Sequence, residues 1–450
     1  MSRSDQPDRS TDVRHAAVEI LDRVDRAGAW ASRLLEARER TFADRRDRAL
    51  LHETVLGVLR RKRLLDAVLA RASDRPLAKL DGLVSATLRV GAYSLLFLDR
   101  VPDHAAVTTA VDSIRRNRPR AVGYVNGVLR KVAREGADWL PTRPEERSVE
   151  AWAEWTSHPD WWVERVVERS GWDAAIAVLE ANNRPARTTL HPNPSRASVE
   201  RLAAALSEKG CRTRPGKMIG ESLRVFSGSP GDALARGQCW VQDEASQLVA
   251  CLAAAGPGMR VLDACAAPGG KTMQLASRVG SKGRVIAMDR HRGRMKRLVE
   301  NIERCGFERV SPLIADMTAA PPFSARFDRI LIDAPCSGTG TLRRHPEIRW
   351  RLTPEAIRLV AERQGRLLDR APGLLADGGR LVYSVCSMEP EEGVQVIASF
   401  LERTPEFSVV DPTPDLPASA HPLVGPDRFL RTNPAADGLD GFFGAVLERR

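Results

Sequence analysis

The chain has 450 residues, of which 43% are hydrophobic and 28% charged. This length allows two or three domains with cores of their own, and the composition is that of an ordinary globular chain without membrane-spanning or secretory segments. The excess of 69 Lys and Arg over 58 Asp and Glu gives a net charge of +11. This charge is compatible with a polyanionic partner, and solvated arginines explain it equally well.

The seven cysteines are odd in number and widely spaced, and none of them forms a CxxC pair. The spacing therefore predicts neither a zinc site nor a disulfide framework, and it favours the reducing cytoplasm as the compartment.

The first part of the chain carries apolar residues at the three- and four-residue spacing of amphipathic helices. The spacing predicts helices over residues 13–24, 50–69, 83–98, 105–114 and 124–132. Because no alternating strand pattern interrupts them, we expect an all-helical domain over residues 1–140. The basic runs Arg60–Arg63 and Arg115–Arg118 could contact phosphates, and solvated helix faces explain them equally well.

Residues 141–235 predict a second, mixed region. It begins with a linker-like stretch at 140–147 and continues with helices that contain five tryptophans, which are more often core residues than base-stacking ones. Strand patterns follow at residues 188–191, 211–213 and 223–226, with a helix at 198–209 after the first strand. We expect a small α+β subdomain that could bind RNA.

From residue 236 to 450 strands and helices alternate. Asp243 or Ser246 can cap a helix at 247–255, and strands are expected at 261–263, 284–289, 311–315, 327–333 and 379–384. This alternation predicts an α/β domain with a mostly parallel, Rossmann-like sheet. Four acidic residues stand at or next to the carboxyl ends of these strands: Asp263, Asp289, Asp316 and Asp333. Ligands of open α/β sheets bind at that edge, and loop capping explains the set poorly.

The stretch from Val261 to Thr272 runs from a strand through small residues into a helix. Small side chains let the backbone approach a ligand, and the helix N-terminus offers free N–H groups. Gly270-Lys271-Thr272 imitates the end of a P-loop, but Cys265 stands where that motif requires glycine. The stretch therefore favours, modestly, a site for S-adenosylmethionine (SAM).

Two cysteines follow two of the expected strands, in Asp333-Ala-Pro-Cys336 and in Tyr383-Ser-Val-Cys386. Carbon C5 of a pyrimidine does not attack a sulfonium methyl unaided, whereas a thiolate that adds to C6 activates C5 by covalent catalysis. The pair therefore indicates methylation of pyrimidine C5. Buried structural cysteines are the alternative, which the motif around Cys336 makes improbable for that residue.

Five segments together resemble the RNA cytosine-5 methyltransferases: residues 263–272, 333–340, 343–350, 383–387 and 440–443. The helical first domain resembles the RNA-binding factor NusB through residues 88–93, Pro102 and residues 126–130. In combination they are similar to the RsmB (Sun/Fmu) family of bacterial 16S ribosomal RNA cytosine-5 methyltransferases.

The resemblance implies SAM contacts from Cys265, Ala266, Ala267, Pro268, Gly269, Gly270 and Lys271. It places Asp289 on the ribose and Asp316 beside the adenine, with Asp333 bordering the methyl group and the cytosine. The nucleophile falls on Cys386, and the cysteine that helps to release the product falls on Cys336.

Lys271 is expected to serve catalysis as well as cofactor binding. Two positions depart from the family pattern: Val385 replaces a common Thr, and Gly393 replaces a common Asn. Neither change removes a reacting group.

Alternative functions are a non-catalytic RNA-binding relic, which would be expected to lose Cys386 or the Gly269-Gly270 turn, and a P-loop nucleotidase. Transfer RNA is the rival substrate. We expect a monomeric cytoplasmic enzyme that uses SAM and methylates C5 of a cytidine in 16S ribosomal RNA, either free or in a partly assembled small subunit, with no metal and no membrane partner.

Overall fold

A computed structural model describes residues 12–319 and 323–450, and the polar first ten residues lie outside this part. The chain forms two compact units. The first ends at Arg184 and also takes in Leu342–Arg351, whereas the second consists of Pro185–Thr341 and Leu352–Arg450. The sequence placed residues 342–351 in the catalytic domain, so their packing with the first unit is a feature that it did not predict.

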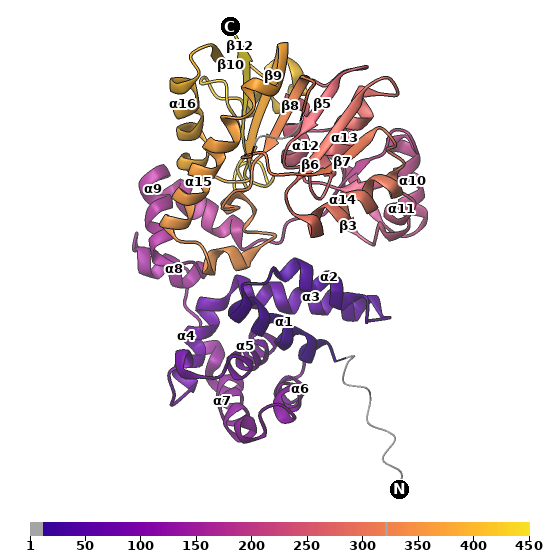
Figure 1. Cartoon of the computed structure of the whole chain (residues 1–450). Helices are drawn as coiled ribbons and strands as arrows, with labels where there is room; N and C mark the ends of the chain where they lie inside the picture. Colours follow the sequence, from indigo (N-terminus) through magenta and orange to yellow (C-terminus); the bar gives the residue numbers. More distant parts are fainter. Residues whose placement is uncertain (1–11, 320–322) are drawn as a thin grey trace. The chain divides into compact units, whose positions relative to one another are not determined.

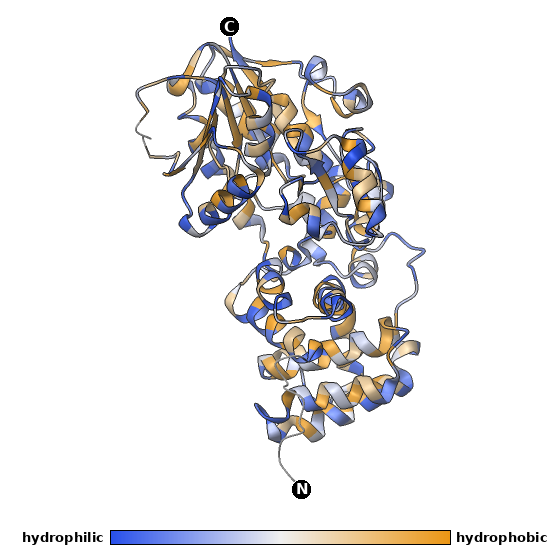
Figure 2. Cartoon of the chain, turned by 90° about the vertical axis from the view of Figure 1, so that its right-hand side faces the viewer, coloured by the Kyte–Doolittle hydropathy of each residue, from blue (hydrophilic) through white to orange (hydrophobic). Residues whose placement is uncertain are grey.

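The first unit is helical, and apolar helix faces form its core. The sequence predicted a helical domain only for residues 1–140, whereas the unit continues to Arg184 and includes the helices of the expected second region. Its helices are α1 (Val13–Ala27), α2 (Ala31–Glu39), α3 (Arg45–Arg60), α4 (Lys62–Ala72), α5 (Gly82–Phe97), α6 (Asp103–Arg115), α7 (Val122–Glu135), α8 (Val149–Thr156) and α9 (Asp160–Asn182) (Figure 1). The helices carry both hydrophobic and hydrophilic segments (Figure 2), as amphipathic helices around a core do. Asp12, Asp44 and Asp81 cap α1, α3 and α5 by accepting backbone hydrogen bonds.

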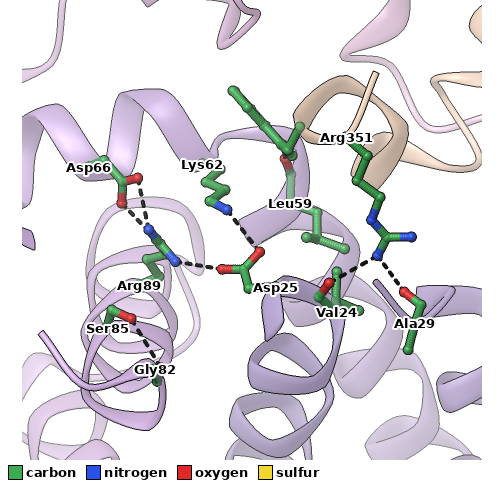
Figure 3. Close-up of polar contacts among 11 residues, drawn as sticks. Val24, Asp25, Ala29, Leu59, Lys62, Asp66, Gly82, Ser85, Arg89 and Arg351 are labelled. Atoms are coloured by element: carbon green, nitrogen blue, oxygen red, sulfur yellow. Dashed lines mark hydrogen bonds and ion pairs between the residues drawn. The ribbon is translucent and has the colours of Figure 1, made fainter. Parts of the chain in front are cut away.

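The single helix predicted over residues 50–69 is wrong, because Arg61 leaves helical geometry (φ −114°, ψ 18°) between α3 and α4. The run Arg60–Arg63 is not the solvated helix face that was one explanation of its charge. The Arg60 side chain is buried, and Arg63 lies 2.8 Å from a carboxylate oxygen of Asp160. Lys62 lies 2.8 Å from Asp25 (Figure 3). The side chains of Arg60, Lys62 and Arg63 therefore all have partners inside the first unit.

The segment Leu342–Arg351 is anchored in the first unit by buried hydrogen bonds. The Arg349 guanidinium donates to the carbonyls of Arg60 (3.2 Å), Ser157 (3.2 Å) and Asn182 (2.7 Å). It also donates to the side-chain oxygen of Asn183 (2.8 Å).

Arg351 adds bonds to the carbonyls of Val24 and Ala29 (Figure 3). Because unpaired buried carbonyls are costly, the guanidinium groups and their acceptors depend on one another.

Replacing Arg349 with alanine is expected to lower the free energy of unfolding of the first unit by about 4 kcal/mol or more, since it removes the donor of four acceptors and each buried acceptor left unpaired costs roughly 1–3 kcal/mol. The measurement is the thermal unfolding of the full chain with amide exchange over residues 149–183. Arg115→Ala removes an exposed guanidinium from the same unit and serves as the control. Equal melting of the two variants would contradict the prediction.

The second unit begins with a four-stranded antiparallel sheet in the order β2-β3-β1-β4. Its elements are β1 (Thr189–Pro192), α10 (Val199–Glu208), β2 (Arg212–Pro215), β3 (Leu223–Ser227), α11 (Gly231–Ala235) and β4 (Cys239–Val241). Leu190 and Leu223 pack against α10 on one face. The predicted strands and helix of this subdomain are confirmed, and β4 and α11 were missed.

The larger sheet has the order β10-β12-β9-β8-β5-β6-β7, and β11 pairs with β12. Its strands are β5 (Arg260–Asp263), β6 (Arg284–Asp289), β7 (Val310–Ile314), β8 (Phe327–Asp333), β9 (Leu375–Val385), β10 (Phe407–Val410), β11 (Leu430–Arg431) and β12 (Phe443–Arg449). The helices are α12 (Glu244–Leu252), α13 (Gly270–Val279), α14 (Arg292–Cys305), α15 (Pro354–Leu368) and α16 (Val394–Arg403) (Figure 1).

Strands β5 to β9 are parallel, and β12 and β10 add antiparallel strands at one edge. Two apolar clusters form the core of this domain. The Rossmann-like α/β fold is thereby confirmed. Among the described helices, none is both long and apolar enough to cross a membrane.

Candidate active site

The carboxyl ends of β5, β8 and β9 bring the predicted reactive residues together, because these three parallel strands are neighbours in the sheet. Asp263 ends β5, Asp333 ends β8, and Cys386 directly follows β9. Asp333 is paired in register with Ser384, and the Ala334 N–H donates to the Ser384 carbonyl at 2.8 Å. The loops after β8 and β9 therefore leave the sheet side by side.

The sulfur atoms of Cys336 and Cys386 lie 3.1 Å apart, within hydrogen-bond distance. Both cysteines are only partly buried. The hydrogen bond to Cys386 is the largest cause that raises the pKa of the Cys336 thiol well above its usual range, followed by burial and the nearby carboxylates. Cys336 therefore stays a thiol and can donate its proton to the sulfur of Cys386.

Cys265 is the third cysteine near this edge, and its surroundings differ. Burial, with smaller contributions from the carboxylates of Asp263 and Asp333, raises the pKa of the Cys265 thiol far above its usual range. A thiol held neutral in this way is a poor nucleophile. Cys265 therefore fits a structural role in the loop better than a role as the attacking group.

Asp333 is held on both carboxylate oxygens. Lys271 Nζ lies 2.7 Å from Oδ2, and the hydroxyl of Ser384 donates to Oδ1 at 2.9 Å. The Lys271 ammonium also lies 5.1 Å from the centroid of the Phe442 ring. The structure thus brings Lys271 and Asp333 together as a fixed ion pair, and each oxygen of Asp333 keeps a lone pair for a further donor.

A buried carboxylate, Glu392, links the two cysteine loops, and sequence reasoning did not single it out. It accepts hydrogen bonds from the Ser337 N–H (2.8 Å) and from the hydroxyls of Ser337 and Ser387. These serines directly follow Cys336 and Cys386. Gln364 donates to the same carboxylate at 3.0 Å. In the sequence, the only hint was that a serine follows each of the two cysteines. The fold shows that these serines and Gln364 all donate to Glu392.

The loop from Cys265 to Gly270 joins β5 to α13 and is held by hydrogen bonds to neighbouring elements. The Ala266 N–H donates to the Met288 carbonyl at 2.9 Å, and Asn301 donates to the Pro268 carbonyl at 3.0 Å. Gly269 has a φ of +109°, which side chains other than glycine rarely adopt, and it caps the N-terminus of α13. The loop therefore presents backbone rather than bulky side chains at the helix start.

Asp289 and Asp316 lie at the ends of the next strands. Asp289 ends β6, is buried, and accepts from the His291 N–H at 2.8 Å through one oxygen. Asp316 follows β7 and accepts from the N–H and the hydroxyl of Thr318. Although partial burial acts to raise the pKa of Asp316, these hydrogen bonds together hold it below its usual value. Both carboxylates therefore stand at the edge of the sheet where the strands end.

Asp263 is almost fully buried and accepts from the Thr272 hydroxyl at 2.7 Å. Burial raises the pKa of Asp263 to about 7. In the unfolded chain the pKa is about 3.9. The folded state therefore holds this proton more tightly, and raising the pH from about 4 to 7 removes stability.

Replacing Asp263 with asparagine is expected to remove this pH-dependent loss of folding stability, because the amide is neutral at every pH and its oxygen can still accept from Thr272. The melting temperature of the variant relative to the wild type should therefore rise between pH 5 and pH 8. The measurement is thermal unfolding of both proteins across this range. A difference that stays constant with pH would contradict the role assigned to Asp263.

The fold and the site together define a class: a Rossmann-like methyltransferase with a helical domain in front of it. Three family models match the chain: the NusB family at residues 11–134, an RsmF/B-like ferredoxin-like domain at residues 158–230, and 16S rRNA methyltransferase RsmB/F at residues 250–448.

Relatives match along the whole chain. A probable ribosomal RNA small subunit methyltransferase B of Bacillus subtilis is 32% identical over 98% of this chain and 100% of its own length. The ribosomal RNA small subunit methyltransferase B of Vibrio cholerae is 33% identical, over 97% and 98%. The chain belongs to the RsmB/F family of 16S ribosomal RNA methyltransferases.

Two solved structures share the fold of this chain. The crystal structure of PH0851 is similar over 97% of this chain and 99% of its own, with a TM-score of 0.83 and 28% identity. A methyltransferase homolog from Pyrococcus horikoshii covers 68% of this chain and 100% of its own, with a TM-score of 0.58 and 26% identity. SAM is the methyl donor of this enzyme class, and the glycine-lined loop with the carboxylate of Asp289 beyond it fits that cofactor.

Proposed function

We propose that the enzyme methylates C5 of a cytidine in 16S ribosomal RNA through a covalent bond between Cys386 and C6 of the ring. The observation that carries the proposal is the 3.1 Å contact between the sulfurs of Cys336 and Cys386 at the sheet edge that holds Asp333. An enzyme that methylates an exocyclic amine has no use for two adjacent thiols at this place.

The loop from Cys265 to Lys271 would hold the cofactor, with Asp289 on its ribose and Asp316 beside its adenine. When bound there, the cofactor supplies a methyl group on a positively charged sulfur. The backbone N–H groups at the start of α13 and the small side chains of the loop allow this close approach.

The reaction starts when the Cys386 thiolate forms a bond to C6. The electron pair of the C5–C6 double bond then becomes available at C5, which takes the methyl group. Asp333, oriented by Lys271 and Ser384, accepts a hydrogen bond from the cytosine and fixes the ring over the sulfur.

Product release requires loss of the C5 proton. Its electron pair restores the C5–C6 double bond, and the S–C6 pair leaves with the sulfur of Cys386. Cys336 assists this step. Its bond with Cys386 is the main cause that raises its pKa, and this cause disappears once Cys386 is bonded to carbon. Cys336 can then release its proton to solvent, and its thiolate takes the proton from C5 as a general base.

The test combines two measurements on the wild-type protein. Methylated cytidines are mapped in total RNA from cells with and without the gene, and the purified protein is given labelled SAM with 16S ribosomal RNA or with transfer RNA. The proposal requires one 5-methylcytidine of 16S RNA to depend on the gene and label to enter 16S RNA. Label in transfer RNA alone, or methylation at another atom, would overturn it.

A further inference from the structure

The antiparallel sheet of the second unit carries an aromatic and basic patch that the active site does not use. We propose that this patch, formed by Arg187, Arg214, Arg224 and Phe226, binds single-stranded RNA by stacking a base on Phe226 and pairing phosphates with the arginines. The proposal rests on the proposed function only for the identity of its polyanion as RNA.

The strand register places the patch on one face. Arg214 on β2 lies directly opposite Arg224 on β3, and Phe226 follows two residues later on the same side. Leu190 and Leu223, which are also paired, point to the other face and pack under α10. The patch therefore lies on the face that α10 does not cover.

Three arginines lie over the Phe226 ring, so a base would stack on it where a guanidinium moves from the ring to a phosphate. The guanidinium carbons of Arg187, Arg214 and Arg224 lie 4.3, 4.6 and 5.8 Å from its centroid. Like charges directly opposite on a sheet are destabilising, so a pair of facing arginines costs stability in the free protein. Among the described residues, no carboxylate forms an ion pair with Arg214 or Arg224. Their charge is therefore available to an external anion.

The rest of this face is closed by the same unit. On β1 and β4, His191 stacks on Trp240 with ring centroids 4.4 Å apart, and Trp240 meets Phe307 edge-on at 6.0 Å. Trp240 is buried in the core of the larger sheet domain. The face is thus covered at β1 and β4, whereas at β2 and β3 Arg214 is exposed and Phe226 partly exposed. A strand bound there is held by the same compact unit as Cys386.

The chemistry of the patch favours a nucleic acid strand over other polyanions. A phenyl ring offers a stacking surface, which every unstacked base can use, and guanidinium groups pair with phosphates. A duplex hides its bases and would use only the charge. An acidic protein segment would satisfy the arginines but has no need of the ring.

The experiment uses the full chain and a fluorescein-labelled single-stranded oligouridine, with affinity measured by anisotropy at several salt concentrations. Phe226→Leu keeps apolar bulk but removes the ring, and we expect it to weaken binding roughly 5- to 150-fold, the range that loss of one stacked base gives. Phe226→Trp should restore the affinity. Arg214→Ala should reduce the slope of log affinity against log salt by about 0.7, the value for one phosphate contact to a single strand.

Arg201→Ala is the matched control, because Arg201 is an exposed arginine on α10 at the opposite face of the same sheet. It should leave both affinity and slope unchanged. Heparin and a duplex of the same length test for a site that recognises charge alone. Equal losses of heparin and oligouridine binding in Phe226→Leu, or no loss of oligouridine binding, would overturn the proposal. Wild-type methyl transfer measured on the same preparation reports separately on the proposed function.

Discussion

Replacing Cys386 with serine is expected to reduce methyl transfer by roughly 10⁴-fold or more, the scale on which enzymes lose activity with their nucleophile. A serine hydroxyl remains protonated at neutral pH and attacks C6 far more weakly than a thiolate does. The variant should fold and bind the cofactor, because the change exchanges sulfur for oxygen at a partly buried position.

The measurement is a denaturing gel with substrate RNA and SAM labelled in the methyl group. The Cys386 variant should show almost no label in RNA and none migrating with protein. Cys251→Ser is the control, since Cys251 is a buried cysteine on α12 whose sulfur accepts hydrogen bonds from Gln274 and Arg278 of α13. Turnover in the Cys386 variant at the control's rate would contradict the assignment.

Replacing Cys336 with alanine is expected to increase the amount of label that migrates with protein, in contrast to the Cys386 variant. Attack by Cys386 and methyl transfer remain possible, but removal of the C5 proton loses its assistance, which is typically a factor of about 10²–10⁴. Methylated RNA should therefore stay bonded to the enzyme, and label should migrate with protein on the same gel. If label accumulates in the Cys386 variant and not in the Cys336 variant, the two roles are reversed.

Much of the larger domain could be predicted from the sequence. Strong strand-helix alternation fixes a parallel sheet, and Asp263, Asp289 and Asp333 were each expected at a strand end, where the structure places them. Cys336 and Cys386 each follow an expected strand, and the carboxyl ends of neighbouring parallel strands meet at one edge of a sheet, so the pattern is compatible with their lying close together. Their 3.1 Å contact agrees with that pattern.

Other features depend on contacts that no local pattern reveals. Glu392 is an ordinary acidic residue in sequence, and its function as an acceptor for both cysteine loops follows only from the packing of β8 beside β9. Arg349 stands in a family motif, yet its burial requires it to meet carbonyls of α3 and α9 that lie 289 and 167 positions away in the chain. The charge of Arg60 suggested a surface role, and burial overrode it.

The covalent bond between Cys386 and C6 of cytosine can be located directly by mapping a trapped adduct. Substrate RNA with 5-fluorocytidine at the target position keeps the adduct intact, because the fluorine at C5 cannot leave as the proton does. The wild-type enzyme is incubated with this RNA and SAM and digested, and the peptide that carries the nucleotide is sequenced by mass spectrometry. We expect a methylated fluorocytidine on Cys386. A nucleotide on Cys336, or turnover without any adduct, would contradict this expectation.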